Sequence, residues 1–123
     1  MSGGSARARI AVKRVYEDPA AGDGCRILVD RLWPRGLSKD RASLDHWFKD
    51  LAPSNELRRW YGHDPEKWDE FRRRFRAELE AEPAVLKPLQ RALETERKVT
   101  LLFSAKNETY NNAVALAEYL RSG

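Results

Sequence analysis

The sequence predicts a small α/β domain of three layers, in which helices cover both faces of a mostly parallel sheet. Two observations support this fold class: short apolar runs bounded by turn residues indicate strands, and amphipathic segments of helical period lie between them. With 123 residues, of which 41% are hydrophobic and 34% are charged, the chain has the composition of one globular domain. We expect this domain to span residues 9–123, after a flexible tail at residues 1–8 that is small, polar and without periodicity.

Three segments predict the strands of the sheet. Residues 9–15, 26–30 and 99–103 are rich in β-branched and aliphatic side chains and are followed by polar or turn-forming residues. The last two are nearly continuous apolar runs, which are typical of strands buried on both faces. A fourth segment, residues 44–51, fits a helix by its spacing and a strand by its length, and we favour the strand.

The helices are predicted from capping residues and from apolar positions three to four residues apart. Residues 38–42 indicate a short helical turn, and residues 54–62 a short helix that ends at a glycine. Residues 64–79 form the clearest helix, with an aspartate cap, a proline in the first turn and a stripe of aromatic residues. Two more helices are expected at residues 88–94 and 113–120.

Composition excludes several classes of protein. The chain has no apolar run of the roughly 20 residues that span a bilayer, and its first residues carry no hydrophobic signal core. Cys25 is the only cysteine, so no internal disulfide forms. His46 and His63 are too few and too isolated to predict a metal site. We therefore expect a cytoplasmic protein of bacterial type with no membrane partner, and the sequence identifies no cofactor.

Charged and aromatic residues follow the predicted strands. Because ligands of open α/β sheets bind beyond the carboxyl ends of the strands, these residues are expected to share one crevice. Arginine side chains match phosphate or carboxylate oxygens, and an indole offers a flat surface for stacking. The pattern predicts a pocket for an anion, and its candidate binding residues are Arg14, Arg31, Trp33, Arg35 and Lys106, with Asp30 as a candidate general base.

A structural interpretation of the same residues stays open. Asp30 could pair with Arg14 or Arg31 to balance charge, and Trp33 could fill the core beneath its loop. The net charge of +4 favours anionic partners only weakly. The arginines at residues 72–76 alternate with carboxylates at helical pairing distances, so a self-paired, solvated face is favoured over a nucleic-acid contact.

The chain lacks the glycine-rich loops and nucleophile motifs of well-known enzymes. Three functional hypotheses therefore stand. The first is binding, with or without turnover, of a phosphate-bearing ligand such as a nucleotide or nucleic acid. The second is an enzyme for a small anionic substrate in which Asp30 and His63 form the acid–base pair. The third is a non-catalytic regulator that binds DNA or a protein, and no oligomeric state is predicted.

Long motifs in the chain resemble a known family. K-R-V-Y-E at residues 13–17, D-G-C-R-I-L-V-D-R-L-W-P-R-G-L-S-K at 23–39, A-P-S-N-E-L-R-R-W-Y-G-H-D-P-E-K-W at 52–68 and T-L-L-F-S-A-K-N at 100–107 carry the resemblance. Together with F-x-x-R-F-x-x-E-L at residues 71–79, they are similar to the YeaO-like branch of the family called domain of unknown function 488, over roughly residues 9–121.

The resemblance implies a small Rossmann-like α/β domain and leaves the activity undefined, because the family is uncharacterised. Longer relatives carry a cysteine and a His-Arg pair after the last strand, where this chain has Ser104 and Asn107, so thiol chemistry is not expected here. The resemblance adds Asn112 to the candidate binding residues. The family's motif positions fall at Arg14, Asp30, Arg31, Trp33, Arg35, Trp47, His63, Asp64, Lys106 and Asn112.

Overall fold

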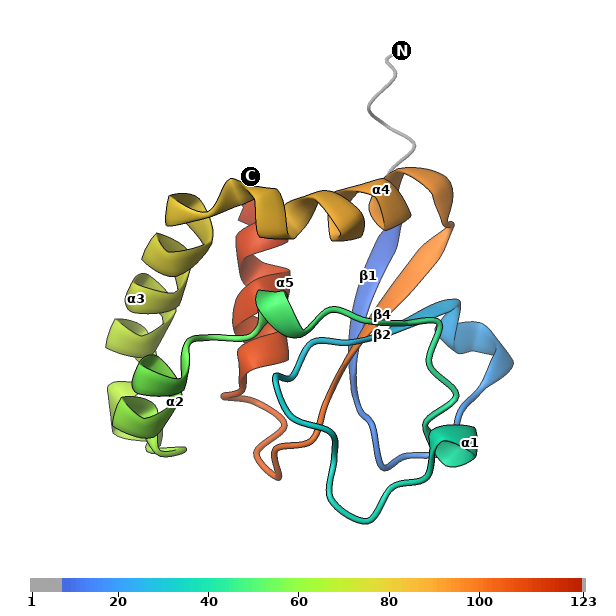
Figure 1. The fold of residues 1–123 in the computed structure, drawn as a ribbon, viewed down its shortest axis with the longest axis horizontal. Coiled ribbons are helices and arrows are strands. Elements are labelled where there is room, and N and C mark those ends of the chain that lie inside the picture. Colours follow the sequence, from blue (N-terminus) through green and yellow to red (C-terminus); the bar gives the residue numbers. More distant parts are fainter. Residues whose placement is uncertain (1–7, 123) are drawn as a thin grey trace.

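Four parallel strands form one sheet in the computed structural model of the protein, which describes residues 8–122 (Figure 1). The order across the sheet is β1-β4-β2-β3, so β4 lies between β1 and β2 and pairs with both. This arrangement confirms the predicted α/β class and parallel sheet. The strands are β1 (Arg9–Arg14), β2 (Cys25–Leu28), β3 (His46–Trp47) and β4 (Lys98–Phe103).

Caps predicted from the sequence are present at the helices of residues 39–42 and 55–61 and at the turn before residues 68–81. Ser38 and Ser54 accept hydrogen bonds at the first turns of α1 and α2, and Gly62 ends α2 in the left-handed region at φ 54°. Asp64 caps a 3-10 turn, Pro65–Lys67, that leads directly into α3. The helices are α1 (Lys39–Ala42), α2 (Asn55–Tyr61), α3 (Trp68–Ala81), α4 (Lys87–Thr95) and α5 (Asn112–Ser122).

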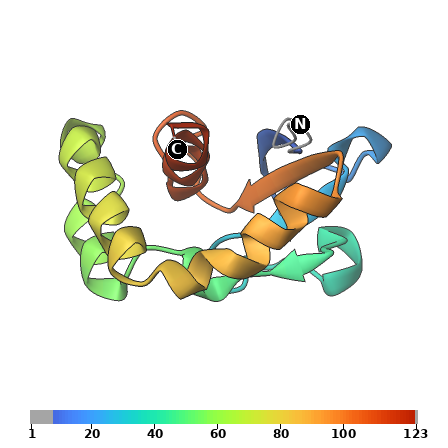
Figure 2. The same ribbon diagram turned by 90° about the horizontal axis from the view of Figure 1, so that it is seen from above.

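Helices lie on both faces of the sheet, but they cover the two faces unequally (Figure 2). On one face, Ile27, Leu101 and other strand residues pack in a large core with the apolar stripes of α3, α4 and α5. On the other face, Leu28 and Leu102 pack in a smaller core under α1 and the loop that follows β2. The thin cover on the second face leaves room for charged groups there.

The fourth predicted strand is much shorter than expected. Only His46–Trp47 pairs with β2, through Ile27 and Leu28, and residues 49–51 form a 3-10 turn that buries Leu51. β2 itself ends at Leu28 rather than at Asp30, and its pairing with β3 stops at the same residue. A single bond from the Val29 amide to the Leu102 carbonyl continues its pairing with β4.

The predicted flexible tail lies outside the described residues, except for Ala8. That residue is buried, and its amide donates to the Leu93 carbonyl at the end of α4.

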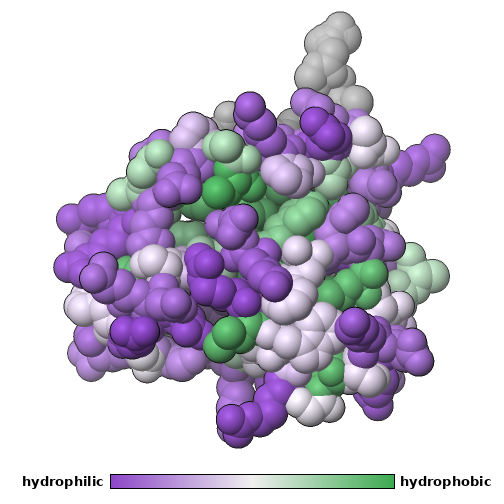
Figure 3. All heavy atoms as spheres, viewed as in Figure 1, coloured by the Kyte–Doolittle hydropathy of each residue, from purple (hydrophilic) through white to green (hydrophobic). Residues whose placement is uncertain are grey.

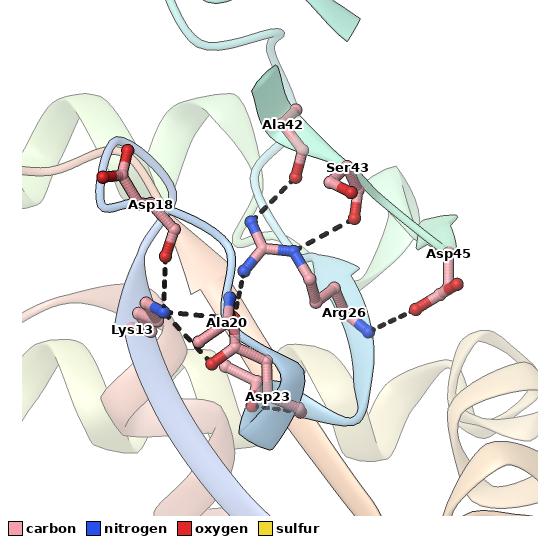
Figure 4. Close-up of polar contacts among 9 residues, drawn as sticks. Lys13, Asp18, Ala20, Asp23, Arg26, Ala42, Ser43 and Asp45 are labelled. Atoms are coloured by element: carbon pink, nitrogen blue, oxygen red, sulfur yellow. Dashed lines mark hydrogen bonds and ion pairs between the residues drawn. The ribbon is translucent and has the colours of Figure 1, made fainter. Parts of the chain in front are cut away.

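A cluster of buried charges lies at the start of β2, on the thinly covered face (Figure 4). Asp23 accepts from the Lys13 ammonium at 3.1 Å and from the Arg26 guanidinium at 2.5 Å. The same guanidinium donates to the carbonyls of Ala42 and Ser43, which tie α1 to the sheet. Burial opposes ionisation of Asp23, but the hydrogen bonds from Ala20, Lys13 and Arg26 outweigh it and hold the pKa of Asp23 below its ordinary value.

Gly24 makes the turn into β2 possible. It has φ 66°, and a Cβ at this position would lie 2.5 Å from the Lys98 carbonyl oxygen. The close approach of these two backbones brings the charged cluster against the sheet, and Thr100 completes the contact with a 2.6 Å bond to the Asp23 carbonyl.

Hydrophilic side chains dominate the face shown in Figure 3, with small apolar areas between them. No helix in the described part of the chain is long and apolar enough to cross a bilayer.

Candidate functional site: a basic cleft at the carboxyl ends of the strands

A cleft of about 1150 Å³ opens at the carboxyl-terminal edge of the sheet. Its walls come from the segments after β1, β2 and β4, from α2 and α3, and from the first residue of α5. This is the edge at which the sequence predicted a crevice, and all eight candidate residues line the cleft. They are Arg14, Asp30, Arg31, Trp33, Arg35, His63, Lys106 and Asn112.

Asp30 is held at the inner end of the cleft, between the ends of the two central strands. One carboxylate oxygen accepts from the Ser104 amide at 2.9 Å and from the Ser104 hydroxyl at 2.7 Å. The other oxygen accepts from the Asn112 side-chain amide at 2.9 Å. The alternative in which Asp30 pairs with Arg14 or Arg31 is wrong, because neutral donors from the loop after β4 and from α5 satisfy the carboxylate instead.

Arg14 ends β1 and reaches across to the loop after β4. Its guanidinium donates to the carbonyl of Ala105 at 2.8 Å and to that of Ser104 at 3.1 Å, and it lies over the ring of Tyr16. The two bonds fix the loop that holds Asp30. Arg14 therefore combines a structural contact with a place in the wall of the cleft.

Arg31 is poorly satisfied. Its guanidinium makes a 3.2 Å bond to the Ala52 carbonyl, and its Nε is buried without a hydrogen-bond partner in the described structure. A buried donor without an acceptor costs roughly 1–3 kcal/mol. A ligand that supplied an acceptor to Nε would remove this cost, provided that the guanidinium rotated to expose Nε to the cleft.

The turn after β2 presents two more candidate residues. Its bond from the Leu37 amide to the Pro34 carbonyl and the positive φ of Gly36, 74°, confirm the predicted tight turn. Trp33 is half-buried, donates its indole N–H to Leu37 and packs on the smaller core, as the structural interpretation predicted. Arg35 is exposed, and only its backbone carbonyl is engaged, by the Tyr16 hydroxyl.

The loop between β4 and α5 is organised by its own asparagines. The Asn107 side chain accepts from the amides of Thr109 and Tyr110, and Asn111 caps α5 by accepting from the Val114 amide. Lys106 lies exposed on this loop, with no hydrogen bond or ion pair to any residue in the range 8–122. The loop therefore presents a free ammonium on a fixed backbone.

His63 lies at the rim, in the left-handed conformation with φ 58°, and is exposed. Within residues 8–122 no hydrogen bond joins it to Asp30. The geometry thus brings the two members of the predicted acid–base pair to one cleft without bringing them into direct contact.

Sequence reasoning missed part of the lining. Arg58 and Tyr61 from α2 reach the cleft, as does Tyr16 after β1. The sequence carried no signal that set Arg58 apart from the neighbouring Arg59.

The arginines of α3 form the self-paired face that was predicted. Arg72 pairs with Asp69 and Glu118, and Arg73 and Arg74 both pair with Glu70. Arg72, Arg73 and Arg74 are absent from the cleft lining and each lies in an ion pair, whereas Arg76 donates to the Ser122 hydroxyl at 2.7 Å.

The remaining reactive groups lie apart from the cleft. Burial, with smaller effects from Asp45 and Glu96, raises the pKa of the Cys25 thiol to about 11, so it stays protonated at neutral pH. Residues 8–122 contain no group of three or more histidine, cysteine, aspartate or glutamate side chains placed to hold a metal ion.

Comparison with known proteins finds one family and several relatives. Residues 9–123 match the family model DUF488-N3i, described as the inactive DUF488-N3 subclade. An uncharacterised protein of Mycobacterium tuberculosis is 45% identical over 112 residues, covering 91% of this chain and 93% of that protein. The uncharacterised protein YeaO of Escherichia coli is 44% identical over 113 residues, covering 92% and 97%. No solved structure matches the chain.

Proposed function

Because the chain belongs to the DUF488 family, in the subclade described as inactive, we propose that it binds a phosphate-bearing ligand in the cleft without transforming it. The relatives found are themselves uncharacterised, so they do not indicate an activity for this chain. The proposal therefore depends on the chemistry of the cleft.

The excess of positive charge in the cleft carries the proposal. Five cationic side chains and one carboxylate line it among the described residues. The carboxylate, Asp30, accepts its hydrogen bonds from neutral donors and forms no ion pair with the cations, so the cleft keeps a net positive charge. Arg35 and Lys106 are exposed and have no partner in the described part of the chain. Free guanidinium and ammonium groups around one cavity favour an anion, and arginine favours the oxygens of phosphate in particular.

The size and the apolar part of the cleft support an organic phosphate rather than a bare ion. The cleft volume of about 1150 Å³ lies just above the range of roughly 300–1,000 Å³ that is usual for pockets that hold small organic molecules. Leu32 is 60% exposed beside the half-buried Trp33, so the wall includes apolar surface that a ligand could cover. A nucleotide combines a phosphate with a flat apolar group and suits both features.

Binding without turnover is favoured over the acid–base alternative. The three hydrogen bonds that the Asp30 carboxylate accepts hold it in place, and among residues 8–122 His63 makes no hydrogen bond to it. The buried Cys25 thiol is protonated and lies outside the cleft lining. Together with the description of the subclade as inactive, these features support a binding protein.

The proposal is tested by titrating the ¹⁵N-labelled protein with a nucleoside 5′-monophosphate and following amide and indole chemical shifts. The expected shifts concentrate on residues 31–35, on 104–107 and on the Trp33 indole. Arg35→Ala should weaken binding roughly tenfold, the value of one charge-assisted contact, with an unchanged melting temperature. Arg91→Ala, which removes an exposed arginine on α4, is the matched control.

Shifts confined to other surfaces, or equal effects of the two substitutions, would contradict the proposal. Titration with duplex DNA at rising salt separates the nucleic-acid alternative, because binding through several phosphates weakens steeply with salt whereas a single phosphate group responds much less.

A further inference from the structure

We infer that Asp30 is a built-in anion: its carboxylate fills an anion-binding position of the sheet edge and keeps free phosphate out of the inner end of the cleft. A ligand's phosphate then binds at the rim, on Arg35 and Lys106, and this second part rests on the proposed function.

The donors around Asp30 are those that bind oxyanions. A backbone amide and a hydroxyl from Ser104 and a side-chain amide from Asn112 converge on the two carboxylate oxygens at 2.7–2.9 Å. None of the three is itself charged. Short bonds from neutral donors to a charged acceptor are strong, so the arrangement stabilises one negative charge at this point.

The position of this charge is the one at which open α/β proteins hold the anionic groups of ligands. Asp30 follows β2, and Ser104 follows β4, the strand next to it in the sheet. Beyond the carboxyl ends of two such central strands, a ligand normally meets backbone amides and the start of a helix. Here the chain itself provides the negative group.

One cation, Arg14, maintains this arrangement without forming an ion pair with Asp30. Arg14 holds the carbonyls of Ser104 and Ala105, and so fixes the loop whose amide and hydroxyl point at the carboxylate. Without the carboxylate, the same loop would present two donors beside a guanidinium. Such a group is suited to one phosphate or sulfate ion.

The presence of Asp30 restricts the ligand. A second anion near the carboxylate would be repelled and would find its donors occupied. A carboxylate has room for more than the three hydrogen bonds that Asp30 accepts, so it can still accept from a ligand. The favoured ligand is thus a phosphate ester that carries hydroxyl or amino groups at the end remote from the phosphate.

The test is calorimetric titration of the full chain with inorganic phosphate. Asp30→Ala should bind phosphate at least about tenfold more tightly than the wild type, because donors to an oxyanion become free. Asp40→Ala, at an exposed position on α1, makes the same change in net charge and should leave phosphate binding unchanged. Adding Ser104→Ala to Asp30→Ala removes one of the three donors and should reduce the gain.

A folded Asp30→Ala variant that binds phosphate no better than the wild type overturns the inference. If that variant is unfolded in buffer, millimolar phosphate should restore its circular dichroism spectrum, and failure to do so also overturns it. The result is separable from the proposed function. A gain in phosphate binding can occur even if the wild type ignores nucleotides, and nucleotide binding by the wild type can stand even if Asp30→Ala gains nothing.

Discussion

Two groups of basic side chains lie on the sheet of this protein, and their charges are balanced in different ways. At the start of β2, Lys13 and Arg26 share the buried carboxylate of Asp23 (Figure 4). At the carboxyl ends of the strands, Arg35 and Lys106 face a cleft without partners among residues 8–122. The first group stabilises the fold, whereas the second is available to a ligand.

The largest effect that separates the groups is expected from Asp23→Ala. Removing the carboxylate leaves the Arg26 guanidinium buried without its counter-charge, which costs roughly 3–5 kcal/mol of unfolding free energy. Denaturant unfolding followed by circular dichroism measures the loss. Asp18→Ala, which breaks an exposed pair with Arg41, serves as the control and should cost less than about 1 kcal/mol. Equal losses would mean that the buried cluster has no special role.

Acid should weaken the first group selectively. The folded state lowers the pKa of Asp23, so its contribution to stability is present above the ordinary aspartate value of about 4 and is lost as the pH falls through the folded-state pKa. The difference in unfolding free energy between the wild type and Asp23→Asn should therefore stay constant from pH 5 to 8 and shrink below pH 4. A constant difference down to pH 2 would contradict this assignment.

Arg31→Ala should change stability little and ligand binding clearly. The substitution removes one long hydrogen bond, but it also removes a buried donor without a partner, so the unfolding free energy should change by less than about 1 kcal/mol. Nucleotide affinity should fall several-fold in the same titration used for Arg35→Ala. A large loss of stability would place Arg31 with the structural group.

The smallest effect is expected on α3, whose arginines are exposed and paired. Arg72→Ala breaks surface pairs with Asp69 and Glu118 and should cost at most about 1 kcal/mol. It should not alter nucleotide affinity, because Arg72 lies outside the cleft lining. A marked loss of binding would move the candidate site from the strand ends to this helix.

Sequence patterns predicted the parallel sheet, the five helical segments and the edge at which the cleft opens. They succeeded where local chemistry decides the structure, as at the caps Ser54 and Asp64 and at the stop Gly62. Periodicity could not fix the extent of β3, because its length depends on where the neighbouring strand β2 leaves the sheet.

Side-chain contacts between segments that are distant along the chain could not be predicted from the sequence. The pairing of Asp23 with Lys13 joins two segments that show no common motif. For Asp30, the sequence offered nearby arginines as partners, whereas the structure provides Ser104 and Asn112, which are distant along the chain. Choosing between these partners requires the strand order.

That strand order also has a consequence for how the protein is made. β4 is the last strand along the chain, yet β1 and β2 both pair with it and not with each other. A nascent chain that ends before Lys98 can form only the two-residue pairing of β2 with β3. The sheet therefore assembles only after residues 98–103 have been synthesised, and truncation before Lys98 removes its centre rather than an edge.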